Sequence, residues 1–355
     1  MASDERDSTP LIRPHLRLVS SPPGGASEPS VEPGGPSSSE QLALLREQYL
    51  FGARLLLHQP AACRNGYRLF WVRGRDLGWM DLEASPENYA VLGYHEQCDV
   101  QLPKRPTISN RHVLASCFLI DGNTPVLRLL DLHTSHPFTI DGQPRTSICV
   151  MGPLLIGLGD CALGCVPLPE FHQRLGLQGD AQLLPPLRSV EAELPPEDLN
   201  GVGGKSSQHM THVTILPRSR RLEDAVAEPR SSGSRVAGMP AAPGFARLTL
   251  QRQQRAVSVE IGEADLYAGV MIGRSESCLD RGLRQVLSGQ ISRLHLLLLA
   301  EKRRVYAMDL CSTNGTWFHE RRARRIPLSD EGTRLVLSGN DSKVELTWHP
   351  RTKTS

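Results

Sequence analysis

The sequence predicts an all-β protein in which two antiparallel β-sandwiches follow one another, with a tail before the first and a linker between them. Three observations support this prediction. Gly (31) and Pro (27) are abundant among the 355 residues while aromatic residues make up only 5%, a composition that favours strands and turns over long helices. Short apolar runs recur at intervals of about 8–12 residues in two separate regions. The two regions also share three short motifs in the same order, which indicates an internal repeat.

The charge balance and the apolar runs exclude several classes of protein. The formal net charge is only +2, which argues against a dedicated nucleic-acid binder. No apolar run reaches the roughly 18–20 residues that cross a bilayer, and residues 1–10 do not resemble a secretory signal. We therefore expect a cytoplasmic protein with no membrane partner. Its eight cysteines form no C-x-x-C pair, so we expect free thiols rather than disulfides or a metal site.

The first 58 residues divide into two parts. Residues 1–39 contain seven Pro, four Gly and nine Ser, and such a composition predicts a disordered tail. In residues 40–58, Leu42, Leu45 and Tyr49 recur at the spacing of one helix face. This pattern predicts a short helix leading into a strand. Packing of the helix on the following domain is the favoured reading, and a partner-binding helix is the alternative.

The rest of the chain divides into two strand-rich regions and a linker. Residues 59–169 are predicted to form the first sandwich, residues 245–349 the second, and residues 350–355 a short tail. Residues 170–244 are rich in Pro, Gly and Ser, and we expect a flexible linker with one local apolar element at His212–Leu216. The apolar runs that predict strands are Arg68–Val72, Tyr89–Leu92, His112–Ile120, Val126–Leu130, Leu154–Gly157, Arg247–Leu250, Val257–Ile261, Val270–Ile272, Leu294–Ala300, Val305–Leu310, Arg334–Leu337 and Val344–Trp348.

The repeated motifs indicate two copies of one fold. Each region has a Gly after an apolar strand, then Ile-Ser with a His three residues after the Ser, then an Asp-Leu pair. The Gly-to-Ser interval is 16 residues in the first region and 19 in the second, and the Ser-to-Asp interval is 22 and 17. Loop-sized differences of this kind leave a common scaffold intact. The anchoring residues are Gly93, Ser109, His112 and Asp131 in the first region, and Gly273, Ser292, His295 and Asp309 in the second.

In the second region, the residues around these anchors suit a phosphorylated ligand. The guanidinium of Arg274 can donate two parallel hydrogen bonds to one phosphate. Arg293 adds a second cation, and Ser292 and Thr313 add hydroxyl donors. Asn314 offers a donor and an acceptor to the backbone of an extended peptide. Together these groups match the charge and the acceptor oxygens of a phosphate group.

Three pieces of this region, Gly273-Arg274, Ser292-x-x-His295 and Ser312-Thr313-Asn314-Gly315-Thr316, resemble the signature of a forkhead-associated (FHA) domain. The resemblance covers residues 245–349 well and residues 59–169 in degenerate form. It implies two FHA-type sandwiches that recognise phosphothreonine through loops at one end. It further implies that Arg274, Ser292 and Thr313 contact the phosphate and that Asn314 contacts the ligand backbone. His295 would pin the loops, and Gly273 and Gly315 would support their shape.

The first copy departs from this pattern where the ligand would bind. Tyr94 stands at the position of Arg274, Ser135 at that of Thr313, and His136-Pro137 at that of Asn314-Gly315. Ser109 and His112 remain, and Arg111 can still offer charge. Pro cannot copy an Asn-Gly turn, because its φ is fixed near −65°. Losing the arginine could cost about tenfold to a thousandfold in affinity. We expect a scaffold or contact surface here. The alternative is a different acidic-ligand site built from Arg111 and His136.

Charge follows the same division between the copies. Residues 245–349 hold 16 Lys and Arg against 12 Asp and Glu, whereas residues 51–169 hold ten of each. A basic excess on the second copy favours an anionic peptide. Four of these charges form the cluster Arg321–Arg325, just after the Asn-Gly loop. It reads first as a solvated hairpin turn, next as a selector for acidic residues that flank the phosphothreonine, and last as a nucleic-acid contact.

The expected function is a non-catalytic phosphothreonine-dependent adaptor. The chain shows no P-loop, no G-x-S-x-G and no H-E-x-x-H motif, so we expect no enzyme, cofactor or metal. The resemblance implies a partner that is a Ser/Thr kinase or its substrate, and Thr9-Pro10 of the tail is a candidate intramolecular ligand. One alternative is a constitutive scaffold whose folds bind no phosphate, with the pocket blocked by the loop Asp280–Arg284. A weaker alternative is a DNA-linked regulator that uses Arg321–Arg325.

Overall fold

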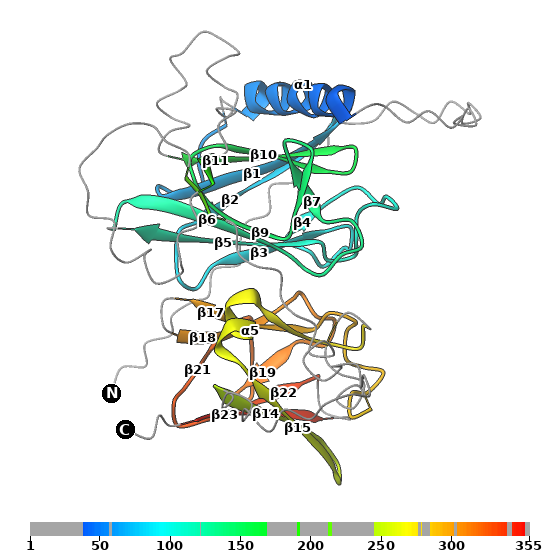
Figure 1. Ribbon diagram of the computed structural model, residues 1–355, viewed down its shortest axis with the longest axis vertical. Coiled ribbons are helices and arrows are strands. Elements are labelled where there is room, and N and C mark those ends of the chain that lie inside the picture. The colour runs from blue at the N-terminus through cyan, green and yellow to red at the C-terminus, as the bar shows by residue number, and fades with distance from the viewer. Residues whose placement is uncertain are drawn as a thin grey trace, which may run out of the picture.

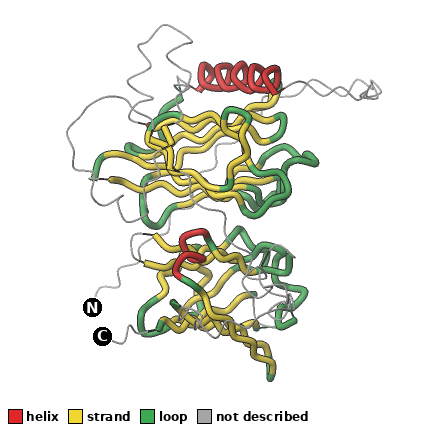
Figure 2. Tube along the Cα trace, viewed as in Figure 1, coloured by secondary structure: helices red, strands yellow, loops and turns green. Residues whose placement is uncertain are grey.

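The computed structural model describes residues 38–56, 59–120, 122–168, 190–191, 212–214, 245–275, 278, 285–301, 304–338 and 343–351. Residues 1–37 of the predicted tail, including Thr9-Pro10, most of the predicted linker, and the loop Asp280–Arg284 lie outside these residues. The prediction of disorder is wrong for Ser38 and Ser39, which begin a helix. The described chain forms two β-sandwiches, one stacked on the other, with one long helix on the outer face of the N-terminal sandwich (Figures 1 and 2). The predicted fold class, all-β with two antiparallel sandwiches, is confirmed.

The N-terminal sandwich consists of two sheets. One has the strand order β2-β1-β11-β10-β7-β8 and the other the order β12-β13-β9-β6-β5-β3-β4. The second sheet is extended at one edge by β12 and β13, which come from the region between the sandwiches. The strands are β1 (Gly66–Arg73), β2 (Asp76–Glu83), β3 (Tyr89–Gly93), β4 (Val100–Gln101), β5 (Val113–Ile120), β6 (Thr124–Asp131), β7 (Phe138–Ile140), β8 (Gln143–Arg145), β9 (Ser147–Met151), β10 (Leu154–Leu158), β11 (Cys161–Pro167), β12 (Val190–Glu191) and β13 (His212–Thr214).

The C-terminal sandwich also consists of two sheets, with the orders β15-β14-β23-β22-β19-β20 and β16-β17-β18-β21. A short helix, α5 (Glu263–Ala268), links β15 to β16. The strands are β14 (Ala246–Arg252), β15 (Arg255–Ile261), β16 (Val270–Ile272), β17 (Leu296–Glu301), β18 (Arg304–Asp309), β19 (Thr316–Phe318), β20 (Arg321–Ala323), β21 (Arg325–Leu328), β22 (Thr333–Leu337) and β23 (Val344–Pro350).

The two sandwiches share one topology. The order β2-β1-β11-β10-β7-β8 in the first corresponds, strand by strand, to β15-β14-β23-β22-β19-β20 in the second. The order β9-β6-β5-β3 likewise corresponds to β21-β18-β17-β16. Equivalent loops therefore leave equivalent strands in both copies. The repeat of three motifs in the sequence thus reflects a repeat of the whole fold.

The helix α1 (Ser38–Leu56) covers the sheet that contains β1, β10 and β11. Its buried face includes Leu45, Tyr49 and Leu56, and the ring of Tyr49 lies 5.3 Å from that of Phe70. The helix therefore packs on the following sandwich, as the favoured reading of its periodicity has it. It ends ten residues before β1 rather than running directly into a strand.

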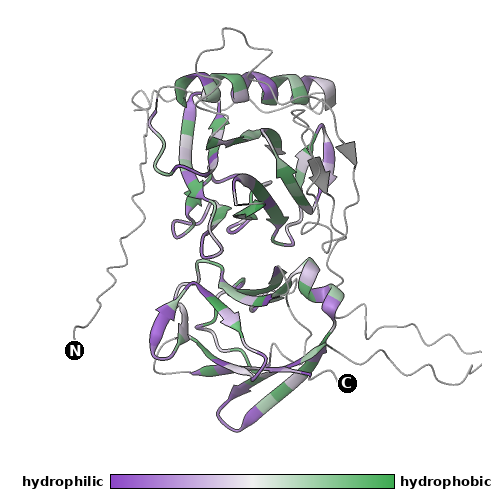
Figure 3. Cartoon of the chain, turned by 90° about the vertical axis from the view of Figure 1, so that its left-hand side faces the viewer, coloured by the Kyte–Doolittle hydropathy of each residue, from purple (hydrophilic) through white to green (hydrophobic). Residues whose placement is uncertain are grey.

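Alternation along the strands gives each sandwich its own core and leaves a second apolar face. In β17, Leu296 and Leu298 face the core of the C-terminal sandwich, while Leu297 and Leu299 face the other way. Figure 3 shows how hydrophobic residues dominate the strands of the N-terminal sandwich, whereas its loops are hydrophilic.

These outward faces meet one another. Side chains of β3, β5 and β6 pack against side chains of β16, β17 and β18 in one buried cluster. Because the strands are equivalent in the two copies, the sandwiches contact each other through the same face of the fold. The buried residues of this interface are Tyr89, Val91, Cys98, Leu114, Leu130 and Leu132 from the N-terminal sandwich and Met271, Cys278, Leu297, Leu299, Met308, Leu310 and Cys311 from the C-terminal one.

Polar side chains also cross the interface. Arg128 donates to the carbonyl oxygens of Tyr267 (2.7 Å) and Ala300 (3.4 Å). The carboxylate of Asp99 pairs with the guanidinium of Arg324 at 2.7 and 2.9 Å. A buried donor without an acceptor costs free energy, so these bonds favour one relative placement of the sandwiches. The packing of one copy on the other was not part of the sequence prediction.

Candidate functional site

Three loop segments of the C-terminal sandwich meet at one edge of the sheet that contains β16, β17 and β18. Arg274 follows β16, Ser292 precedes β17, and Thr313 follows β18. The three strands are antiparallel neighbours, so the end of one and the start of the next lie at the same edge. The structure thus brings together residues that are up to 39 positions apart in the sequence.

Gly273 lies so close to the backbone of Arg293 that a side chain cannot be accommodated there. The N–H of Arg274 donates to the carbonyl of Ser292 at 3.2 Å, and the N–H of Ser275 donates to that of Arg293 at 2.9 Å. This pairing holds the β16 loop against the loop before β17. A Cβ on Gly273 would lie 2.0 Å from the carbonyl oxygen of Arg293. Close approach of two backbones, rather than an unusual φ, therefore requires this glycine.

The side chain of Arg274 is exposed at this edge, and its Nε donates to the carbonyl oxygen of Ile291. Among the described residues, no acceptor is recorded for its two terminal nitrogens. One hydrogen bond thus fixes the guanidinium plane while leaving two nitrogens for a ligand. Such an arrangement suits bidentate binding of a phosphate.

Ser292 and Thr313 are joined across the two loops. The N–H of Thr313 donates to the Oγ of Ser292 at 3.1 Å. Because Ser292 accepts in this bond, its own hydroxyl hydrogen is left to donate to a ligand. Ser292 is mostly buried, whereas the side chain of Thr313 is exposed. The pair therefore presents one fixed and one accessible hydroxyl beside Arg274.

Asn314 and Gly315 shape the opposing loop. The side-chain Nδ2 of Asn314 donates to the carbonyl of Gln290 at 2.7 Å, which ties this loop to the segment before Ser292. Gly315 has φ +76°, a conformation that disfavours side chains. A Cβ there would also lie 2.4 Å from the Nε of Arg322. The amide oxygen of Asn314 stays available as an acceptor for a peptide backbone.

His295 lies beneath the site, with no exposed surface. Its Nδ1 accepts the N–H of Ser292 at 3.3 Å, and its Nε2 lies 3.9 Å from the Oδ2 of Asp309. Burial lowers the pKa of His295 to about 4, so the ring is neutral near pH 7. A neutral buried ring that holds the Ser292 backbone suits the structural role that the resemblance implies.

Asp309 is a residue whose part in the site the sequence analysis did not identify. Its carboxylate accepts hydrogen bonds from the N–H (2.7 Å) and hydroxyl (2.6 Å) of Ser312 and from the hydroxyl of Thr316 (2.7 Å). It therefore fixes both ends of the loop that carries Thr313. The sequence signal is a repeated spacing, because each copy has a hydroxyl residue three positions after the Asp: Thr134 after Asp131 and Ser312 after Asp309. Asp131 bonds the N–H and hydroxyl of Thr134 in the same way.

The first copy keeps the same supports. His112 is fully buried, its Nδ1 accepts the N–H of Ser109 at 3.0 Å, and burial lowers its pKa to about 4. Ser135 is exposed and its Oγ lies 3.0 Å from the Nδ1 of His136. Tyr94 stands where the second copy has its arginine, and its backbone N–H bonds to the carbonyl of Ser109 as the equivalent bond does in the second copy.

Two of the predicted site residues lie elsewhere than expected. Arg111 is buried in the interface, where its Nε and Nη2 donate to the carbonyl oxygens of Leu310 and Cys311. These bonds occupy the charge that the alternative acidic-ligand site would need. Arg293 is exposed, and it lines a cavity on the loop end of the N-terminal sandwich. The structure thus places Arg293 between the two copies.

The basic cluster lies on the hairpin of β19 and β20 and just after it. Arg322 donates to the carbonyl of Ser312 at 3.0 Å. Arg324 pairs with Asp99, and Arg325 pairs with Glu301 at 2.6 Å. Three of its four arginines therefore have partners within the chain. This arrangement weakens the reading of the cluster as a nucleic-acid surface.

In the part of the chain that the structure describes, no group of three or more His, Cys, Asp and Glu side chains is placed to hold a metal ion. All eight cysteines are free thiols. None of the described helices is both long and apolar enough to span a membrane.

Comparisons with known proteins converge on one family. Residues 270–337 match the model of the FHA domain, and no curated protein matches the chain. Similar solved structures include the FHA-1 domain of Mycobacterium tuberculosis Rv1747, with 24% identity over 31% of this chain and 100% of that one (TM-score 0.23). The FHA domain of a Chlamydia trachomatis protein shares 16% identity over 28% and 96% (TM-score 0.25). EmbR of Mycobacterium tuberculosis, solved with a low-affinity phosphopeptide, shares 20% over 31% and 26% (TM-score 0.21).

The matched segment begins at β16 and ends with β22. It therefore includes all three loop segments that meet at the site, from Gly273-Arg274 to Gly315. The sequence signature and the match therefore fall on the same residues. The chain contains a forkhead-associated domain, located in its C-terminal sandwich at residues 270–337.

Proposed function

We propose that the C-terminal sandwich binds a phosphothreonine segment of a partner protein and that the chain is a non-catalytic adaptor in Ser/Thr kinase signalling. One observation carries the proposal: Arg274, Ser292 and Thr313 lie at one sheet edge, with the guanidinium held by a single bond and a hydroxyl hydrogen of Ser292 left to donate. A dianionic phosphate with three acceptor oxygens matches that donor set. The partner is a Ser/Thr kinase or one of its substrates.

In this proposal the N-terminal sandwich is a scaffold. It contributes Tyr89, Arg111 and Arg128 to the interface, and all three side chains bond to backbone carbonyls of the C-terminal sandwich. Its own site has Tyr94 in place of the arginine and Pro137 in place of the glycine. Such a copy supports the site of the C-terminal sandwich through these bonds to its backbone. Eight free thiols are in keeping with a reducing compartment such as the cytoplasm.

The test is a titration of the full chain with a degenerate phosphothreonine peptide library. The full chain is needed because residues such as Leu297 and Met308 would be exposed in the C-terminal sandwich alone. Phosphoserine and unphosphorylated libraries serve as controls, and Arg274→Ala is measured beside the wild type. We expect micromolar binding that requires phosphothreonine and is lost in the variant.

Binding that is indifferent to phosphate, or that persists in Arg274→Ala, would overturn the proposal. The chain would then be a constitutive scaffold that keeps the signature without the affinity. A matched variant, Arg255→Gln, controls for loss of positive charge, because Arg255 is exposed on the hairpin of β14 and β15. It is expected to bind as the wild type does.

A further inference from the structure

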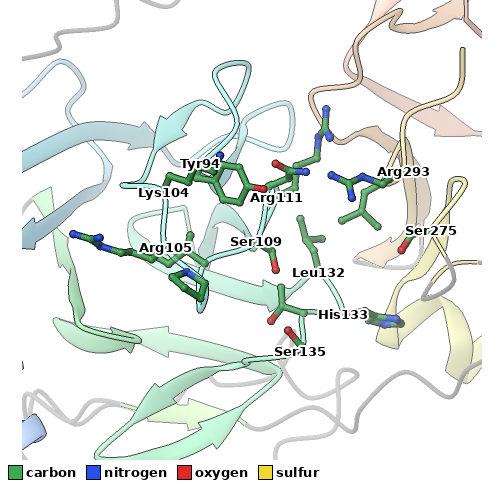
Figure 4. A pocket seen from close by; sticks show the side chains of 15 residues that line it. Tyr94, Lys104, Arg105, Ser109, Arg111, Leu132, His133, Ser135, Ser275 and Arg293 are labelled. Atoms are coloured by element: carbon green, nitrogen blue, oxygen red, sulfur yellow. The ribbon is translucent and has the colours of Figure 1, made fainter. Parts of the chain in front are cut away.

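A cavity of about 670 Å³ lies at the loop end of the N-terminal sandwich, where the C-terminal sandwich meets it. Its walls come from both copies. The N-terminal sandwich contributes Tyr94, Ser109 and Ser135, among others, and the C-terminal sandwich contributes Ser275 and Arg293 (Figure 4). The cavity is therefore shared by the two packed copies.

The described residues that line the cavity carry positive charge and no negative charge. It includes Lys104, Arg105, Arg111 and Arg293, and no Asp or Glu. Among the described residues, none accepts a hydrogen bond from the guanidinium of Arg293. Arg111 is already bonded to the carbonyl oxygens of Leu310 and Cys311. An anion in the cavity would therefore be attracted chiefly by Lys104, Arg105 and Arg293.

The cavity also contains two hydroxyl groups equivalent to those of the candidate site in the second copy. Ser109 and Ser135 occupy the positions that Ser292 and Thr313 hold in the second copy. His112 holds the backbone of Ser109 as His295 holds that of Ser292. The supports for phosphate recognition therefore survive, although the arginine has become Tyr94.

Arg293 brings a cation from the other copy to this cavity. Its side chain extends from the C-terminal sandwich toward the part of the cavity where Tyr94 lies (Figure 4). The equivalent residue of the first copy is the uncharged Asn110. The C-terminal sandwich therefore brings a cation to the site of the first copy, which has Tyr94 in place of an arginine, whereas Asn110 brings none to the second.

We propose that this cavity is a second anion site, built by both sandwiches, for a phosphate group on a second phosphorylated residue of the same partner segment. Arg293 directly follows Ser292, and Ser275 directly follows Arg274. The cavity therefore begins where the phosphothreonine site ends, and one extended segment can reach both. The proposal goes beyond the function proposed above, because it gives the degenerate copy a ligand of its own.

The experiment compares singly and doubly phosphorylated peptide libraries on the full chain. One phosphothreonine is fixed, and a second is placed at each neighbouring position in turn. At the favoured spacing, we expect the second phosphate to strengthen binding about tenfold or more, as one or more charge-assisted hydrogen bonds would. In Arg293→Gln, and separately in a Ser109→Ala and Ser135→Ala double variant, this gain should be lost. Arg255→Gln should keep it.

The outcomes separate this proposal from the previous one. If singly phosphorylated peptides bind through Arg274 but no spacing of a second phosphate gains affinity, the cavity is not a phosphate site and only the further proposal fails. If binding needs two phosphates and is lost in the Ser109 and Ser135 variant but not in Arg274→Ala, the cavity is upheld and the proposed function fails. A gain that glutamate reproduces in place of the second phosphothreonine would overturn specificity for phosphate.

Discussion

The hydroxyl of Tyr89 in the N-terminal sandwich lies 2.5 Å from the carbonyl oxygen of Asp309 in the C-terminal one, and 2.7 Å from that of Arg324. Asp309 is the residue whose carboxylate fixes the loop that carries Thr313. The carboxylate of Asp309 therefore supports the candidate site, and its backbone carbonyl is bonded by the neighbouring copy. The degenerate sandwich thus has a direct physical connection to the site it does not itself contain.

Replacing Tyr89 with Phe should destabilise the whole chain. The ring, and its contact with the guanidinium of Arg324 at 4.8 Å, would remain, but a buried hydrogen bond would be lost. We expect a loss of about 1–2 kcal/mol in the free energy of unfolding. Urea unfolding of wild type and variant measures it. An unchanged midpoint would show that the hydroxyl bond contributes nothing to the packing of the two copies.

The pair of Asp99 and Arg324 should couple the two sandwiches. Its nitrogen and oxygen atoms are 2.7 Å apart, and the arginine side chain is 40% exposed while the aspartate side chain is 7% exposed. We expect a double-mutant cycle of Asp99→Asn and Arg324→Gln to give a coupling energy of about 0.5–1 kcal/mol that weakens with added salt.

The matched control for this cycle is the pair of Arg247 and Glu260, which lies within one sheet and is more exposed on both sides. Its coupling energy should be smaller than that of Asp99 and Arg324. Equal coupling in the two pairs would mean that the interface pair acts as an ordinary surface ion pair.

The sequence carried enough information for the fold class and for the convergence of Arg274, Ser292 and Thr313. Each of these residues adjoins a strong apolar run, and antiparallel pairing of three such strands leaves little choice about where their ends meet. The short strands were not predictable in the same way. Strands such as β8 (Gln-Pro-Arg) and β20 (Arg-Arg-Ala) carry no apolar alternation, and neighbouring strands hold them in place.

The packing of one sandwich on the other lay beyond the prediction, although one signal for it existed. Residues 296–300 read Leu-Leu-Leu-Leu-Ala, and a strand that is apolar on both faces is a strand buried on both faces. The fate of Arg111 follows from the same geometry. Because His112 points into the core, its neighbour Arg111 points the opposite way, which is toward the other copy. Sequence periodicity shows that this face is apolar but does not show which part of the chain covers it.

The two buried histidines should make the protein less stable in mild acid. Burial lowers the pKa of His112 and His295 from the ordinary 6.5 to about 4. Between these values the unfolded chain takes up protons that the folded chain does not. Their stabilising contribution is therefore complete above about pH 6.5 and is lost as the pH falls toward 4, by up to about 1.4 kcal/mol per pH unit for each ring.

His295→Asn tests this pH dependence directly. Asparagine keeps an acceptor oxygen near the position of Nδ1 but does not titrate, so the N–H of Ser292 retains a partner. Urea unfolding across the range from pH 7 to pH 4 should show a shallower loss of stability in the variant than in the wild type. Parallel curves would show that the pKa of His295 does not differ between the folded and the unfolded chain. His112→Asn is the corresponding test in the first copy.

Gly273→Ala should damage both the stability of the C-terminal sandwich and its binding of phosphothreonine. The new Cβ would lie 2.0 Å from the carbonyl oxygen of Arg293, and that oxygen accepts the N–H of Ser275. The two loops must separate, which moves Arg274 away from Ser292. We expect a loss of about 2 kcal/mol or more in the free energy of unfolding and little remaining affinity for the phosphothreonine library.

Gly289→Ala is the matched control for this substitution. Gly289 lies in the segment just before Ser292, and no described residue other than its chain neighbours lies within 4 Å of where its Cβ would be. Its stability and affinity should stay close to those of the wild type. The comparison decides whether the close approach of two backbones, and not the loss of a glycine as such, positions the site. If Gly273→Ala keeps full affinity, Arg274 does not need the pairing of the β16 loop with Arg293 to reach its position. Close contact between the two loops then does not shape the phosphate site.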